Sequence, residues 1–172
     1  MISWGIPPKS KHTVKECLRY ALPRGIPLRM PRLHPFNPLL ALRVTCAADS
    51  EAERRAITHA LFALGWVQGG DLSAADEIAQ ALSAAGLRVS ELMELAQSPT
   101  IKEHLRAETD AAIARGVFGV PTMLVDDELF WGVSQLPNLE LYLTDRDPLA
   151  GLDPTQFMAQ GIGAWRPDVP RS

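Results

Sequence analysis

The order of apolar and polar residues predicts a run of amphipathic helices over most of the chain. Between residues 11 and 116, apolar positions recur every three to four residues, and the periodic stretches have start and stop signals of their own. The expected helices cover residues 11–22, 38–48, 51–69, 74–86, 90–96 and 100–115. This part of the chain is therefore expected to form a helical subdomain.

Capping signals fix several of these starts. Asn37-Pro38 combines an N-cap side chain with a proline at the first helical position, and Ser98-Pro99 repeats the device. Ser50 and Glu53 have the spacing of a capping box. We expect Ser90 to cap the short helix that follows it.

The pattern changes after Gly119, where strand formers replace the helical period. Thr122–Val125 and Glu128–Trp131 flank the two-residue turn Asp126-Asp127 and predict an antiparallel hairpin. A helix over Ser134–Leu143 should follow. Because two strands alone are marginal in water, another chain or a preceding segment is expected to complete the sheet.

Composition limits the function classes. With 172 residues and 47% hydrophobic content, the chain suits one globular domain, and its apolar stretches are too short for a membrane span. The first residues do not form a secretory signal, so a cytoplasmic location is the default expectation. Residues 1–43 hold eight basic residues and one acidic residue, which suits a carboxylate ligand or a solvated basic face. No nucleic-acid-binding motif accompanies this charge.

The two cysteines do not form a redox or metal motif. Cys17 and Cys46 lie too far apart in sequence for a C-x-x-C pair or a zinc site, and we expect both to be small buried apolar residues. His34 is expected to be a packed loop residue. Phe130 and Trp131 should alternate between the core and a groove.

The run Ala111–Gly132, AAIARGVFGVPTMLVDDELFWG, carries a family resemblance that extends back to Pro7-Pro8-Lys9. It resembles 2-hydroxychromene-2-carboxylate isomerases and kappa-class glutathione transferases of the DsbA-like thioredoxin superfamily. The resemblance implies an α/β, thioredoxin-like fold of the DsbA type with a large inserted helical subdomain. The thioredoxin domain would cover residues 1–146, with the insertion at about 10–116 and the thioredoxin C-terminal half at about 117–146. A tail follows at 147–172 and is expected to lack regular elements, because it is too rich in Pro and Gly.

In such proteins an N-terminal βαβ unit presents the serine that activates the glutathione thiol, and this unit is expected to be missing here. Ser3 has no strand-to-helix context, so no catalytic residue is assigned. Lys9 aligns with a lysine that contacts a glutathione carboxylate, although a solvated lysine is the alternative. The Val120-Pro121 bond is expected to be cis, which would aim the Val120 main chain at the cysteinyl backbone; a trans proline opening an edge strand is the alternative.

Val133 and Ser134 occupy the place where relatives have a small polar residue and an aspartate at the start of the last helix. The resemblance assigns this place to the γ-glutamyl end of glutathione, while a plain N-cap role is the alternative for Ser134. Glutathione is thus the expected cofactor, a small aromatic carboxylate the substrate, and cis–trans isomerisation in aromatic catabolism the activity. Turnover is in doubt without the serine.

The alternative is a non-catalytic, truncated thioredoxin-like binding or assembly module. A disulfide oxidoreductase is disfavoured because there is no C-x-x-C pair. The incomplete sheet also leads us to expect a homodimer.

Overall fold

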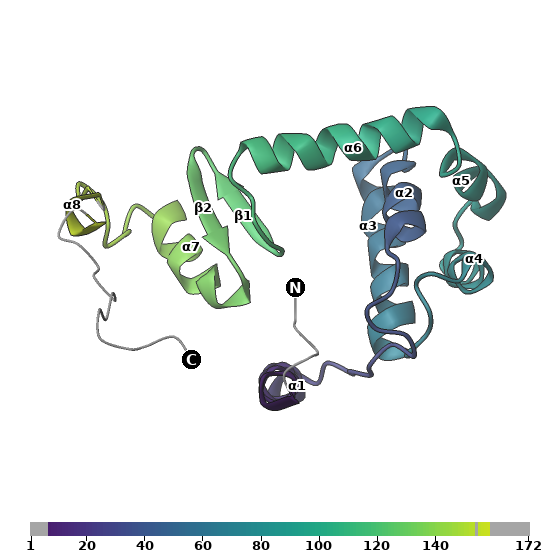
Figure 1. Cartoon of the computed structure of the whole chain (residues 1–172), viewed down its shortest axis with the longest axis horizontal. Coiled ribbons are helices and arrows are strands. Elements are labelled where there is room, and N and C mark those ends of the chain that lie inside the picture. Colours follow the sequence, from purple (N-terminus) through teal and green to yellow (C-terminus); the bar gives the residue numbers. More distant parts are fainter. Residues whose placement is uncertain (1–6, 154, 159–172) are drawn as a thin grey trace, which may run out of the picture. The chain divides into compact units, whose positions relative to one another are not determined.

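The structure, a computed structural model, describes residues 7–153 and 155–158. It divides into two compact units, Met1–Ala111 and Ala112–Ser172, each of which is described by itself. Figure 1 labels their helices and strands. Among the residues that the structure describes, no helix is long and apolar enough to cross a membrane.

The first unit is helical, as the apolar period predicts. Its elements are α1 (Pro7–Ala21), the 3₁₀ turn η1 (Leu22–Arg24), α2 (Leu39–Cys46), α3 (Glu51–Phe62), the π-helical turn η2 (Ala63–Val67), α4 (Ala75–Ala84) and α5 (Val89–Leu95). Helix α6 (Pro99–Ala114) follows and runs across the boundary between the units. The expectation that residues 11–116 form a helical subdomain is confirmed, since the elements that the structure describes in this range are helices and helical turns, with no strand.

Hydrogen bonds in the structure confirm the predicted caps at Ser50 and Ser98. The Ser98 hydroxyl accepts a hydrogen bond from Ile101 N at 3.2 Å. The Asn37 side chain accepts one from Leu39 N at 3.0 Å, but it stands one residue before the N-cap position of α2, which Pro38 occupies. Ser50 Oγ accepts from Glu53 N at 3.1 Å. The Glu53 carboxylate reaches back one residue further than in a standard capping box, because it accepts from Asp49 N.

Two helix starts differ from expectation. Helix α1 begins at Pro7, so Lys9 lies inside the helix and not before it. The Ser90 cap is wrong, because α5 begins at Val89 with Arg88 in the N-cap position. The Arg88 guanidinium is held by carboxylates at the start of α3, and this contact fixes where α5 begins.

The core of the first unit lies among α2, α3, α4 and α5. Its largest fully buried side chains are Val44, Ile57, Ile78, Leu82 and Leu92. Burying each of them stabilises the fold by about 1.5–3 kcal/mol relative to leaving it exposed. Glycine Gly69, with φ +74°, ends the α3–η2 segment where a side chain would be strained.

The second unit contains the predicted hairpin. Strand β1 (Thr122–Val125) pairs antiparallel with β2 (Glu128–Trp131), and Val125 stands opposite Glu128 across the two-residue turn. The 3₁₀ turn η3 (Val133–Gln135), α7 (Leu136–Leu143) and the short α8 (Thr155–Met158) follow. Within the described part of the chain the sheet has these two strands.

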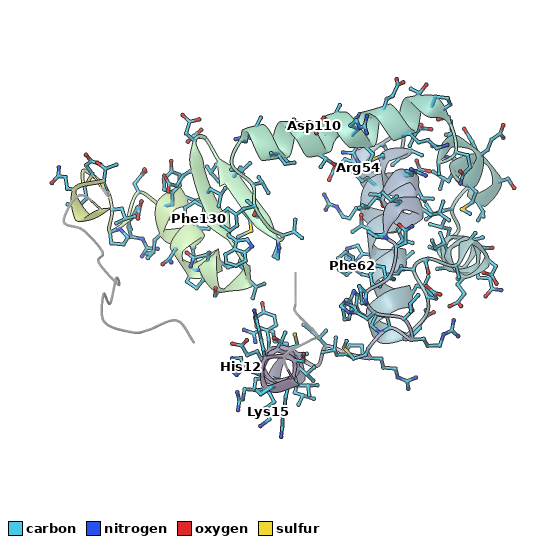
Figure 2. The ribbon with its side chains drawn as sticks, viewed as in Figure 1. His12, Lys15, Arg54, Phe62, Asp110 and Phe130 are labelled. Carbon is cyan, nitrogen blue, oxygen red and sulfur yellow. The ribbon has the colours of Figure 1, made fainter. Side chains whose placement is uncertain are left out.

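The hairpin packs one face on α7. Phe130 is buried, and its ring meets that of Tyr142 edge-on at 5.5 Å between centroids; Figure 2 labels Phe130 beside α7. Trp131 is 51% exposed, so the predicted alternation of the two rings is confirmed. The Tyr142 pKa is raised, mainly because packing removes water from its hydroxyl group. Nearby acidic side chains raise the pKa further.

The expectations for the cysteines and the tail need correction. Cys17 is exposed on α1, so the expectation that both cysteines are buried is wrong for it, whereas Cys46 is half-buried and desolvation raises its thiol pKa. The tail, expected to lack regular elements, contains α8, and Asp153 Oδ1 accepts a hydrogen bond from Thr155 N at its start. Residues 154 and 159–172 lie outside the described residues.

Candidate functional site

The candidate site is centred on the Val120-Pro121 peptide bond, which is cis as expected. Val120 precedes β1 and is 85% exposed. Among the described residues, neither its N–H nor its C=O makes a hydrogen bond with the chain. An exposed residue with both main-chain groups available can pair with an extended ligand.

Neighbouring bonds hold the Val120 backbone in place. The Thr122 hydroxyl donates to the Gly119 carbonyl oxygen at 2.6 Å, and Gly132 N donates to the Pro121 carbonyl oxygen at 2.8 Å. The bonds fix the residues on both sides of Val120 while leaving Val120 itself unpaired. The second bond also ties the start of β1 to the end of β2.

An apolar surface lies beside these main-chain groups. The Phe118 and Trp131 rings are 5.1 Å apart between centroids and tilted by 60°, and both are more than half exposed. Gly119 allows this packing, because a Cβ there would lie 2.6 Å from Trp131 Nε1. Sequence reasoning missed Phe118; its place just before Gly119 and Val120 was the signal available.

Val133 and Ser134 lie just after β2, in η3. Gly132, with φ 90°, turns the chain out of the strand, and the Gly132 N–Pro121 O bond links this turn to the Val120 segment. The α-helix begins only at Leu136, with Gln135 at its N-cap and no capping side-chain bond. The expected N-cap role of Ser134 is therefore wrong, because a 3₁₀ turn is inserted before α7.

The site's electrostatics are set by main-chain groups. The acidic residues of the hairpin, Asp126, Asp127 and Glu128, lie at its turn, which is the end opposite Trp131 and Gly132. Within the described residues, no group of three or more His, Cys, Asp or Glu side chains could hold a metal ion. The site can thus offer N–H donors and an apolar wall to a ligand.

Lys9 belongs to the first unit. It is exposed on the first turns of α1, and its carbonyl oxygen accepts the Thr13 hydroxyl at 3.1 Å. The structure thus brings Val120, Pro121, Val133 and Ser134 together in one unit and describes Lys9 in the other. Ser3 lies outside the described residues.

A helical unit and a hairpin followed by a helix, with a cis proline before the hairpin, define a thioredoxin-like protein with an inserted helical part. The family model of the DsbA-like thioredoxin domain matches residues 1–144. The chain therefore belongs to the DsbA-like thioredoxin domain family.

Within this family, the chain is similar to isomerases and to a kappa-class glutathione transferase. The chain is 31% identical over 138 residues to a 2-hydroxychromene-2-carboxylate isomerase of Sphingobium xenophagum, covering 80% of this chain and 70% of the relative. It is 27% identical over 158 residues to glutathione S-transferase kappa 2 of Caenorhabditis elegans, covering 81% and 68%. A solved structure of a 2-hydroxychromene-2-carboxylate isomerase matches with a TM-score of 0.74 at 28% identity, covering 81% of this chain and 68% of that one.

Proposed function

We propose that this chain contributes the glutathione-binding half of a protein of the 2-hydroxychromene-2-carboxylate isomerase type. The observation that carries the proposal is the exposed, unpaired main chain of Val120 beside the cis Pro121, in a chain whose relatives bear the isomerase and kappa transferase names. The ligand would be glutathione and the substrate a small aromatic carboxylate.

The Val120 segment would bind the middle of glutathione as an added strand. The cysteinyl residue of the tripeptide has one N–H and one C=O, which match the acceptor and donor that Val120 offers. The Phe118 and Trp131 rings would lie beside the bound peptide and provide an apolar surface for an aromatic substrate.

The γ-glutamyl carboxylate would bind at the turn after β2. Gln135 N already donates to Gly132 O, so the N–H groups of Val133 and Ser134 are the donors left at this turn. The ammonium group of the γ-glutamyl residue would have no aspartate partner at this turn, because Ser134 stands where the family pattern has an aspartate. Lys9 belongs to the first unit, and its role as a point charge for the other carboxylate of the tripeptide rests on the family resemblance alone.

Catalysis needs one group that glutathione binding does not need. Adding the glutathione sulfur to an unsaturated substrate needs a donor that stabilises the thiolate. No residue of this sequence matches the family's activating serine, so we propose that the 172-residue chain binds glutathione weakly and does not turn substrate over.

The binding step is tested by titrating the unaltered chain with glutathione, followed by calorimetry and amide chemical shifts. Val120→Pro removes the N–H donor and should weaken binding by about five- to tenfold, because one main-chain bond is lost. Val120→Thr is the matched control, since it keeps the N–H and a β-branched side chain, and it should bind within twofold of the unaltered chain. Equal affinity of the proline variant and the unaltered chain would refute the Val120 contact.

The catalytic step is tested by following 2-hydroxychromene-2-carboxylate with the chain and glutathione. The rate should equal that of glutathione alone, and fusing the N-terminal βαβ unit of a relative should raise both affinity and turnover. Turnover well above background by the chain itself would show that one of its own residues activates the thiol. Binding that persists without turnover even after fusion would favour the alternative, a non-catalytic binding module.

We also propose that the second unit associates with a second copy. Phe118, Val120, Trp131, Val133 and Leu136 expose apolar side chains in this unit. Contiguous apolar surface beside an open strand edge favours self-association.

A further inference from the structure

A second candidate site lies wholly within the helical unit. It is a cavity of about 420 Å³ between α1, the segment that follows it, and the end of α3 with η2. Helix α1 lines it with Ser10, Thr13, Val14, Cys17 and Leu18. The opposite walls are Leu28, Met30, His34, Phe62 and Trp66.

The sequence of α1 builds one wall by helical spacing. Residues 10, 13, 14, 17 and 18 stand at positions i, i+3, i+4, i+7 and i+8, which places them on one face of the helix. The opposite face is polar: Figure 2 shows His12 and Lys15 projecting on the side of α1 away from Phe62. Helix α1 thus turns its apolar face to the cavity and its polar face to solvent (Figure 2).

Main-chain bonds hold the other walls in place. Arg29 N donates to Trp66 O at 2.6 Å, and Arg32 N donates to Gly69 O at 3.1 Å, so the segment after α1 is fastened to η2. The His34 ring meets the Trp66 ring at 5.8 Å between centroids. Trp66 lies in the π-helical turn η2, a type of distortion that is frequent at functional sites.

The chemistry of the lining defines the ligand. Among the described residues that line the cavity, none is an acid, a lysine or an arginine, and the Thr13 hydroxyl is already bonded to Lys9 O. A carboxylate ligand would lose its hydration here and would have the His34 imidazole as its one basic partner among the lining residues named above. The Phe62 and Trp66 rings instead offer flat surfaces for stacking.

The volume sets the size. An apolar cavity of about 150 Å³ is enough to hold benzene, and ligand sites begin at about 300 Å³. We propose that this cavity binds an uncharged aromatic molecule of two or three fused or linked rings. The site needs neither glutathione nor the second unit, so its test is independent of the proposed isomerase function.

The test uses the unaltered 172-residue chain and N-phenyl-1-naphthylamine, an uncharged dye that fluoresces in apolar surroundings. Binding should saturate at one dye per chain, and naphthalene should displace the dye at least tenfold more effectively than 2-naphthoate. Displacement by 2-naphthoate at equal concentration would overturn the assignment to uncharged ligands, and lack of saturation would overturn the site.

Variants locate the bound dye. Val14→Phe and Leu28→Phe fill the cavity and should weaken binding at least tenfold, whereas Lys15→Phe, on the opposite face of α1, should stay within twofold. Val120→Lys disrupts the apolar surface of the second unit and should also leave dye affinity unchanged. Dye binding that survives both cavity variants, or that is lost in Val120→Lys, would refute the cavity as the site.

A measurement on the unaltered chain tests the proposal even if the cavity-filling variants Val14→Phe and Leu28→Phe do not fold. Cys17 is exposed and lines the cavity, whereas Cys46 does not line it. Saturating naphthalene should slow the reaction of N-ethylmaleimide with Cys17 severalfold, measured by peptide mass spectrometry, and leave the Cys46 rate unchanged. Equal rates at Cys17 with and without naphthalene would contradict the proposal.

Discussion

A single hydrogen atom at position 119 decides the shape of the candidate site. The Gly119 Cα has room for Trp131 because it lacks a Cβ, which would lie 2.6 Å from the indole Nε1. The Trp131 ring, in turn, borders the exposed Val120 main chain together with Phe118. The packing of one glycine thereby positions the apolar wall next to the main-chain donor and acceptor.

Gly119→Ala should therefore move Trp131 and lower the free energy of unfolding by about 1–2 kcal/mol, the usual cost of overpacking. Urea denaturation measures the loss, and near-ultraviolet circular dichroism reports the moved indole. In a Trp131→Leu background the same substitution should cost little, because the clashing ring is gone. An equal cost in both backgrounds would show that the backbone, and not the indole, excludes the methyl group.

For single residues, the sequence predicted a local backbone feature better than the exposure of a side chain. The Gly-Val-Pro-Thr segment and its family resemblance indicated the cis bond at Val120-Pro121, which the structure contains. The exposed thiol of Cys17 was not predicted, because apolar neighbours in sequence do not show how fully other elements cover a helix face.

Helix starts in the first unit depend on one charge cluster. Arg88 binds Glu53 through two nitrogens, with Nε–Oε1 at 2.8 Å and Nη2–Oε2 at 2.9 Å, and also pairs with Asp49 and Glu91. The Glu53 side chain is only 16% exposed. The cluster joins the first turn of α3 to the start of α5.

The hydrogen bonds from Arg88 and from Asp49 N lower the Glu53 pKa to about 2. The folded-state pKa lies below the unfolded value, so the charged carboxylate stabilises the fold above about pH 4.5, and this contribution is lost as the pH falls toward 2. Glu53→Gln should lower the unfolding free energy by about 1–2 kcal/mol at pH 7 and flatten its acid dependence. Urea denaturation from pH 7 to pH 2 measures both effects.

Glu51→Gln is the matched control on the same helix. Glu51 lies in the first turn of α3, but its side chain is 71% exposed and its contacts to Arg54 and Arg55 are 3.8 and 3.6 Å long. Exposed pairs of this kind contribute little, so this variant should keep the acid dependence of the unaltered chain. The same flattening in both variants would mean that general helix charge, and not the Arg88 contact, sets the pH response.

The sequence predicted that the helices exist, but it did not predict where α5 and α7 begin. The contacts of Arg88 and Gly132 show why. The apolar period identifies each helix because burial acts along its whole length. The start of α5 depends on Arg88 and Glu53, which are 35 positions apart. Ser134 was expected to cap the last helix, but the bond between Gly132 and Pro121 fixes the chain before it and a 3₁₀ turn follows.

For the whole molecule, the open edge of the hairpin is the main feature. The Gly132 N–Pro121 O bond sets the alternation of paired positions, so the main-chain groups of Thr122 and Leu124 point away from β2. With Val120 they form a row of main-chain groups, at every second residue, that have no partner within residues 7–153 and 155–158. The sequence indicated this edge, since two predicted strands cannot form a stable sheet alone.

This edge and the apolar side chains near it should make the chain self-associate. Sedimentation velocity at micromolar concentration should show a species heavier than one 172-residue chain, and Phe118→Lys should shift it toward the monomer, because a charge in an apolar contact is costly. Leu22→Lys is the matched control: Leu22 and Phe118 are both 71% exposed, but Leu22 lies in the helical unit.

The Leu22→Lys control shows whether association depends on the second unit or on any exposed apolar side chain. If association depends on the second unit, Leu22→Lys should sediment like the unaltered chain, and glutathione should weaken association because it competes for the Val120 main chain. A compact monomer at every concentration would contradict an association driven by the open edge. Dissociation by Leu22→Lys alone would place the contact in the helical unit and leave the Val120 segment free for its ligand.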